Sequence, residues 1–167
     1  MVHPRPIAVA VAIAALAALI AAPSHAATPP CAPRALDVWL NTHGGAAAGS
    51  TYYKLEFTNL SARTCTLRGY PGVSAIGASG RQLGSPAGRN PAHTSRTVTI
   101  ARGGSAVAVL QITDAHNFPP ASCRLVTAAA LRVYAPGATQ AKTVLFPFLT
   151  CAKTGPVTLH AESIQRT

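Results

Sequence analysis

The sequence predicts an all-β fold, an immunoglobulin-like antiparallel β-sandwich of about nine strands held by two disulfides. Three observations support this prediction. Short apolar runs alternate with polar residues at a period of two, turn-forming residues separate the runs, and four cysteines follow the amino-terminal segment. Together they are typical of a small exported β domain rather than of a helical or mixed fold.

The clearest strand pattern lies in the segment 50–60, where Tyr53, Leu55 and Phe57 alternate with polar residues. A period of two places Tyr53 with the core residues and turns Tyr52 outward. Only the alanine-rich segment 121–130 has the composition for a short helix. The other predicted strands are 36–40, 73–76, 81–83, 97–100, 105–113, 131–134, 142–148 and 156–164.

Glycine and proline mark the turns between these runs. Proline sets the backbone for a turn and glycine tolerates conformations that other residues avoid, so clusters of the two separate one strand from the next. The turn signals are Tyr70-Pro71-Gly72, Gly77-Ala78-Ser79-Gly80, Arg102-Gly103-Gly104, Phe118-Pro119-Pro120 and Ala135-Pro136-Gly137.

The first 26 residues are predicted to be a secretory signal peptide. Arg5 precedes an apolar run over residues 7–22, and the small residues Ser24 and Ala26 mark a cleavage site after Ala26. The run is short for a membrane span, and an uncleaved anchor is the alternative that it leaves open. Residues 27–34 are expected to form an extended lead-in because three prolines exclude a helix interior, and residues 35–166 to form one sandwich domain. Prolines 29 and 30 stand where a lipoprotein has a lipobox, so the chain is expected to be secreted and not a lipoprotein.

All four cysteines are expected to form disulfides in the oxidising exterior. No two cysteines have the Cys-x-x-Cys spacing that is typical of zinc or redox sites. Four cysteines allow three pairings, and the sequence alone leaves all three open. Order along the chain favours Cys31–Cys65 and Cys123–Cys151, because each pair then joins neighbouring segments.

The chain is strongly basic, with 14 Lys and Arg against 4 Asp and Glu and a formal net charge of +10. A basic exported protein is drawn to anionic cell-envelope polymers or membrane surfaces, whereas nucleic acid is not an expected partner. The alternative is a diffuse positive surface without an evolved target. The sequence makes no prediction of oligomeric state. The candidate polyanion contacts are the loop arginines Arg63, Arg68, Arg81, Arg89, Arg96 and Arg102.

No catalytic residue, metal ligand or cofactor is predicted. The glycine-rich strings before Arg81 and Ser105 are better explained as turns than as nucleophile elbows. The pairs Asp114/His116 and His160/Glu162 each place two possible ligands on one face of a strand. Neither pair has a third ligand at motif spacing, so neither predicts a metal site.

A family resemblance covers nearly all of the predicted mature chain, from about Leu36 to Ile164. The sequence resembles the actinobacterial secreted family catalogued as domain of unknown function 4232. That resemblance implies an exported or lipid-anchored β-sandwich and supplies no catalytic residues. The segments that carry it are Ala48-Gly49-Ser50, Leu55-Glu56-Phe57-Thr58-Asn59, Cys65-Thr66-Leu67-Arg68-Gly69-Tyr70-Pro71-Gly72-Val73, Gly103-Gly104-Ser105-Ala106, Leu131-Arg132-Val133-Tyr134, Pro136-Gly137 and Cys151.

Three classes of function follow from these observations. The leading expectation is a non-catalytic binding module outside the cell or in its envelope, because a sandwich presents loops on a rigid scaffold. A small secreted enzyme or enzyme inhibitor is the second class. A metal-carrying secreted domain is the third.

Overall fold

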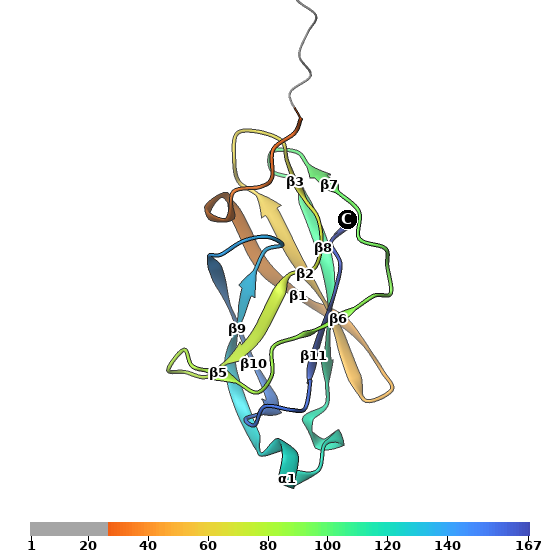
Figure 1. The fold of residues 1–167 in the computed structure, drawn as a ribbon, viewed down its shortest axis with the longest axis vertical. Helices are drawn as coiled ribbons and strands as arrows, with labels where there is room; N and C mark the ends of the chain where they lie inside the picture. The colour runs from red at the N-terminus through yellow and green to blue at the C-terminus, as the bar shows by residue number, and fades with distance from the viewer. Residues whose placement is uncertain (1–26) are drawn as a thin grey trace, which may run out of the picture.

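The computed structural model describes residues 27–167, and the predicted signal peptide lies outside this range. The chain is all-β and is built mainly from two sheets (Figure 1). The larger sheet has six strands, ordered β1 (Leu36–Ala47), β2 (Ser50–Asn59), β8 (Ser105–Thr113), β11 (Leu159–Glu162) and β6 (Gly88–Asn90), with β12 (Gln165–Arg166) also on β8. The second sheet has the order β10 (Ala141–Cys151), β9 (Leu125–Tyr134), β4 (Gly72–Ile76) and β5 (Gln82–Leu83).

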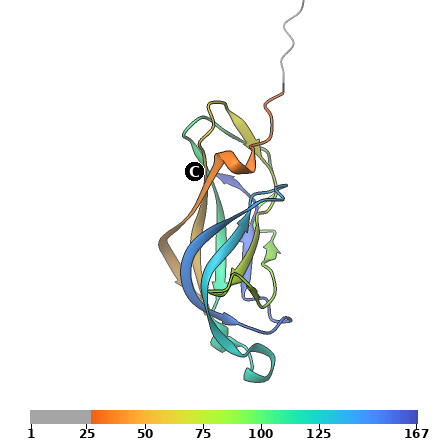
Figure 2. The same cartoon turned by 90° about the vertical axis from the view of Figure 1, so that its left-hand side faces the viewer.

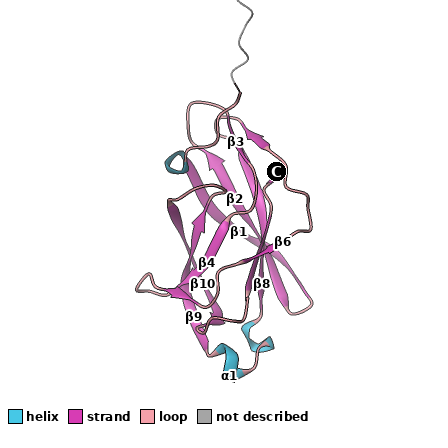
Figure 3. Cartoon of the chain, in the orientation of Figure 1, coloured by secondary structure: helices cyan, strands magenta, loops and turns pink. Residues whose placement is uncertain are grey.

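Two short strands and three short helical turns complete the described structure. The strands β3 (Cys65–Leu67) and β7 (Val98–Ile100) form a separate antiparallel pair. A 3₁₀ turn, η1 (Pro33–Ala35), precedes β1, and η2 (Ala115–Asn117) and α1 (Pro120–Cys123) follow β8. In Figure 3, η1 lies toward the end of the molecule that carries β3, while α1 lies at the opposite end.

The core lies between the two sheets, which face each other in Figure 2. Leu55 and Phe57 of β2 are fully buried, as the period-two pattern predicts, and so is Leu110 of β8, which stands opposite Tyr53 in the same sheet. Leu131 and Val133 of β9 supply the facing layer. Alanines of β8 pack into this core as well, because a small side chain lets the sheets approach closely.

Strand pairing is antiparallel among the described strands except between β6 and β11, which run parallel. The expectation of a purely antiparallel fold is therefore wrong at this edge. Gly88 of β6 pairs with His160 of β11, and a Cβ atom added at Gly88 would lie 2.8 Å from Cδ2 of the His160 ring. Glycine is therefore needed where this edge strand meets the imidazole.

The described residues form twelve strands rather than about nine. Each of the nine predicted runs contains a strand, and the additional ones are β3, β6 and β12. These three have only two or three residues each, too few to show a periodicity.

Within the segment 121–130, the one that could hold a short helix by composition, a helix forms only over the first residues. The helix α1 ends at Cys123, and β9 begins at Leu125. β9 pairs with β10 along its whole length, and these tertiary hydrogen bonds override the weak helical preference of its alanines.

Two disulfides join Cys31 to Cys65 and Cys123 to Cys151, the pairing that chain order favours. The lead-in is partly helical rather than extended throughout, because Pro33–Ala35 form one 3₁₀ turn with proline in its first positions. Residues 27–167 contain no helix long and apolar enough to cross a membrane.

Candidate functional site

Four of the six candidate arginines gather at the end of the molecule that carries β3 and β7 (Figure 1). Arg63 lies in the β2–β3 loop, Arg68 follows β3, Arg96 precedes β7, and Arg102 follows β7. All four side chains are exposed. The pairing of Cys65 with Ile100 and of Leu67 with Val98 brings these segments together, although they are about 33 residues apart in the sequence.

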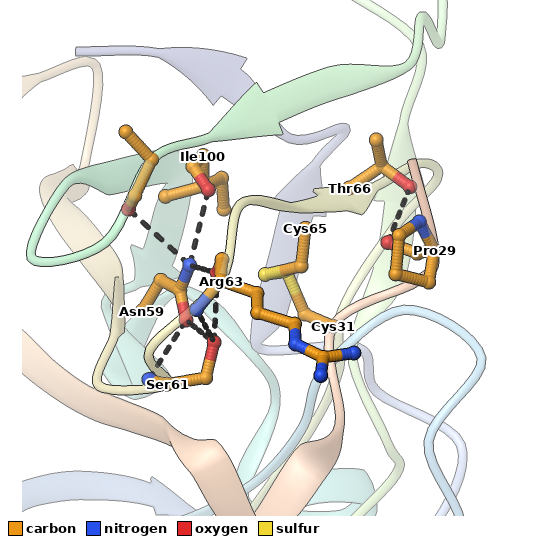
Figure 4. Close-up of a disulfide and its surroundings, with 9 residues drawn as sticks. Pro29, Cys31, Asn59, Ser61, Arg63, Cys65, Thr66 and Ile100 are labelled. Atoms are coloured by element: carbon orange, nitrogen blue, oxygen red, sulfur yellow. Dashed lines mark hydrogen bonds between the residues drawn. A yellow bond between two sulfur atoms is a disulfide. The ribbon is translucent and has the colours of Figure 1, made fainter. Parts of the chain in front are cut away.

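A buried amide ties the two loops of this end together (Figure 4). Asn59, at the end of β2, is completely buried. Its Nδ2 donates to the backbone oxygens of Arg63 at 2.8 Å, Ile100 at 3.0 Å and Ala101 at 3.2 Å. Its Oδ1 accepts from the backbone N–H of Ser61 at 3.0 Å and from the Ser61 hydroxyl at 2.7 Å. One side chain therefore fixes the loop of Arg63 against the loop that leads to Arg102.

The first disulfide anchors the lead-in to the same place. The backbone N–H of Cys31 donates to the backbone oxygen of Thr66 at 2.9 Å, and the backbone N–H of Thr66 donates to the backbone oxygen of Pro29 at 2.9 Å. In Figure 4 the Arg63 side chain extends away from the buried Asn59 amide. The loop backbone is thus held by bonds to its neighbours while the guanidinium faces solvent.

Two shallow hollows flank the other end of the β3–β7 pair. One, of about 480 Å³, is lined by Arg68 together with Cys31 and Pro136. The second, of about 420 Å³, is lined by Arg96 and Arg166. Thr97, which directly precedes β7, lines both hollows. Arg68 and Arg96 therefore lie on either side of the start of β7.

Two further arginines, which are not among the six predicted contacts, belong to this end. Arg34 is exposed on η1, whose last residue, Ala35, accepts a hydrogen bond from Leu60 just after β2. Arg166 lies on β12, opposite Ala106 at the start of β8. The predicted Cys31–Cys65 disulfide indicates this position, because Arg34 closely follows Cys31 in the sequence. We call Arg34, Arg63, Arg68, Arg96, Arg102 and Arg166 together the arginine-rich end.

The remaining two candidate arginines lie elsewhere. Arg81 is in the turn between β4 and β5, which projects from the side of the molecule in Figure 1. Arg89 lies on β6 with its guanidinium carbon 5.4 Å from the centre of the Tyr70 ring. This cation–π contact occupies one face of the guanidinium.

The arginine-rich end carries cations that no carboxylate neutralises by contact. Within residues 27–167, both carboxylate ion pairs involve histidines, His93 with Glu162 and His116 with Asp114. Asp37 is the acidic residue nearest to this end in the strand register, and its Oδ1 accepts from the backbone N–H of Val38 at 3.0 Å. The guanidinium groups are therefore available to an anionic partner.

The histidine–carboxylate pairs form contacts but no larger cluster. Asp114 Oδ1 accepts from the backbone N–H of His116 at 3.0 Å and lies 2.8 Å from its ring Nδ1. The backbone hydrogen bond, followed by the ring hydrogen bond, lowers the pKa of the Asp114 carboxyl below its usual value. His93 Nε2 lies 3.5 Å from Glu162 Oε2. The described residues hold no group of three or more histidine, cysteine or acidic side chains arranged for a metal ion.

Comparison with known proteins identifies the family of the chain. No curated protein and no solved structure matches it. A family model, described as a domain of unknown function (DUF4232), matches residues 31–164, a range that includes both disulfides, Asn59 and the β3–β7 pair. The chain belongs to this DUF4232 family.

Proposed function

We propose that this chain is an exported, non-catalytic domain of the extracellular space or cell envelope that binds anionic polymers through its arginine-rich end. We place the scaffold among the immunoglobulin-like sandwiches. The observation that carries the proposal is the gathering of six exposed arginines from separate segments, with no carboxylate in ion-pairing contact.

Export is supported by the sequence and by the disulfides. Residues 1–26 have the order of a secretory signal, and all four cysteines of the described chain are disulfide-bonded. An oxidising compartment is where such bonds form and persist. The polymer would accordingly be one that an exported protein meets, such as an anionic wall polymer or an anionic membrane surface.

The geometry of the end favours a polymer over a single small anion. The β3–β7 pair has three residues in each strand, so it spans roughly 10 Å at about 3.3 Å per residue. Arg63 and Arg102 lie at one end of this pair, and Arg68 and Arg96 at the other. A guanidinium presents paired N–H donors that match phosphate and carboxylate oxygens, so a chain with repeating anionic groups would contact both ends at once.

Co-sedimentation with anionic wall polymer, anionic vesicles and neutral vesicles tests the proposal. The salt concentration is raised from about 50 mM to about 0.5 M, across the range in which the screening length falls below about 10 Å. We expect retention on an anionic partner at low salt, loss of retention at high salt, and no retention on neutral vesicles. Retention on wall polymer alone or on anionic vesicles alone then distinguishes the two sources of the anion.

Two triple variants separate a defined site from net charge. Arg63→Ser, Arg68→Ser and Arg102→Ser together remove cations from the arginine-rich end, and we expect them to abolish retention. Lys54→Ser, Arg81→Ser and Lys142→Ser remove the same charge from other parts of the surface and should leave most of the retention. Equal losses in the two variants would show a diffuse positive surface and overturn the proposal, as would absence of retention at low salt.

A further inference from the structure

A second candidate site lies between the sheets, in the half of the molecule opposite the arginine-rich end. It is an open hollow of about 510 Å³ beside the β1–β2 hairpin and β10. This volume lies within the range of pockets that bind small organic molecules. Its wall is aromatic, with Tyr53, Phe146 and Phe148, and its polar side chains are Ser50, Thr51, Thr113 and Asp114.

Backbone irregularities in two edge strands meet at this hollow. In β1, residues 42–44 stand opposite the single residue Tyr53 of β2. In β10, residues 146–147 stand opposite the single residue Ala129 of β9. The Tyr53 and Phe146 rings contact each other edge to face with centroids 5.1 Å apart, and Phe148 stacks on Phe146 at 5.7 Å. Bulges re-aim side chains, and here Phe146 in the irregular segment of β10 and Tyr53 opposite that of β1 line the same hollow.

The hairpin that borders the hollow is fixed in place. The Gly49 oxygen accepts from the backbone N–H of Asp114 at 2.9 Å and from Asn117 Nδ2 at 3.1 Å. Gly49 has φ of 72°, and a Cβ atom there would lie 2.6 Å from Asn117 Nδ2. A Cβ atom at Gly44 would lie 2.1 Å from the Tyr52 oxygen. The hollow is therefore built into the backbone and requires no rearrangement to form.

The charge at the hollow is opposite to that of the whole chain. Asp114 is the one ionisable side chain other than Tyr53 among the lining residues, although the chain has 14 Lys and Arg and only 4 acidic residues. Its carboxyl is ionised at neutral pH, and hydrogen bonds from His116 lower its pKa further below the usual value. A carboxylate beside aromatic faces is complementary to an organic cation, which both kinds of group attract.

We propose that this hollow binds a small organic ammonium ion with an apolar body, its cation on Asp114 and its body against Tyr53, Phe146 and Phe148. This inference does not depend on polymer binding at the arginine-rich end. The carboxylate is exposed to solvent, so we expect modest affinity with a clear preference for positive charge.

Three ligands of similar shape test the charge preference on the oxidised chain at pH 7. They are 2-phenylethylammonium, neutral 2-phenylethanol and anionic phenylacetate, titrated while the amide resonances are followed by NMR. We expect the cation to bind about threefold more tightly than the alcohol, the scale of an ion pair at an exposed carboxylate. Shifts should be largest in residues 46–51, 112–114 and 146–149. Equal affinity for cation and alcohol, tighter binding of phenylacetate, or shifts outside these segments would overturn the proposal.

Variants identify the groups responsible. Asp114→Asn keeps an acceptor for the His116 N–H and should lower affinity for the ammonium about threefold while leaving the alcohol unchanged. Asp37→Asn removes one carboxylate outside the hollow and should change neither affinity. Phe146→Leu keeps an apolar side chain of similar size and should weaken binding of both ligands. Unchanged ammonium affinity in folded Asp114→Asn would contradict the assignment of the cation to this carboxylate.

Discussion

The arginine-rich end and the opposite end of the molecule are each closed by one disulfide, yet the two bonds lie in different surroundings. Cys31 and Cys65 belong to the main core together with Leu67 and Ile100. Cys123 and Cys151 belong to a small separate cluster with Ala115 and Phe118. The sequence separations, 34 and 28 residues, are similar. Chain entropy therefore assigns both bonds nearly the same stabilisation, and packing makes the difference between them.

The two ends also differ in charge and in what holds their loops. At the arginine-rich end, the Asn59 amide and the Cys31–Cys65 disulfide fix loops whose charged side chains are all arginines. At the other end, the backbone N–H of Asp114 and the side-chain amide of Asn117 donate to the Gly49 oxygen and fix the hairpin against η2, and Asp114 supplies an anion. Two sites of opposite charge on one scaffold should therefore respond independently to changes at either end.

The largest expected effect is the loss of a disulfide. Cys31→Ala with Cys65→Ala, and Cys123→Ala with Cys151→Ala, should each lower the free energy of unfolding by about 3.5–4 kcal/mol. Only the first pair should also weaken polymer retention, because the lead-in and β3 carry the arginine-rich end. Urea unfolding and co-sedimentation of the folded variants measure the two quantities. Weakened retention in the second variant and not in the first would contradict the assignment of polymer binding to the end that Cys31–Cys65 supports.

Loss of the buried amide should come next. Asn59→Ala removes five hydrogen bonds and leaves the buried Ile100 oxygen without this donor, which should cost about 3 kcal/mol. The matched variant Ser61→Ala removes only the hydroxyl bonds and should cost about 1 kcal/mol. Denaturant unfolding of both variants gives the difference. Similar losses would show that Asn59 does not tie the two loops together.

Much of the fold could be predicted from the sequence because its long strands have one buried face. The alternation of Leu55 and Phe57 with Glu56 is visible in the sequence and is the burial pattern of β2. The strands β3, β6 and β12 are too short for such a pattern, and their pairing depends on distant segments. The alanine-rich composition of residues 121–130 is local and leaves a short helix possible, whereas the pairing of β9 with β10, which makes a strand of most of them, is not local.

Only part of the candidate site could be predicted from the sequence, because its assembly also depends on pairing between distant segments. Turn composition places Arg63, Arg68, Arg96 and Arg102 at the surface, but equally Arg81 and Arg89. Which arginines meet is decided by the β3–β7 pairing and by the anchoring of the lead-in. The hollow beside Tyr53 was not predicted because a bulge leaves no mark in the sequence unless its partner strand is known.

The smallest expected effect is the pH dependence that Asp114 contributes. Its pKa is lowered below the usual 3.8 by bonds from His116, so the folded state favours the ionised carboxyl. The resulting stabilisation is present above pH 3.8 and is lost as the pH falls through the lowered pKa. Thermal unfolding of Asp114→Asn should therefore differ slightly from that of the parent at neutral pH, and the difference should fade in acid.

A second variant checks the cause of this pH dependence. His116→Ala removes the ring bond and retains the backbone N–H, which is the larger of the two causes. We expect it to keep part of the pH dependence that Asp114→Asn loses. Identical melting curves for Asp114→Asn and the parent at every pH would contradict the role of these bonds.

The assignment of polymer binding to the arginine-rich end is tested most directly by NMR of the isotope-labelled, oxidised chain. Short-chain polyphosphate is added at low salt, and the shifts of the amide and arginine side-chain resonances are mapped onto the structure. We expect the largest shifts at Arg63, Arg68, Arg96 and Arg102 and in their loops, weaker shifts at Arg81 and Arg89, and reversal at high salt. Shifts of equal size at all arginines, or shifts concentrated at Arg81 and Arg89, would contradict this account.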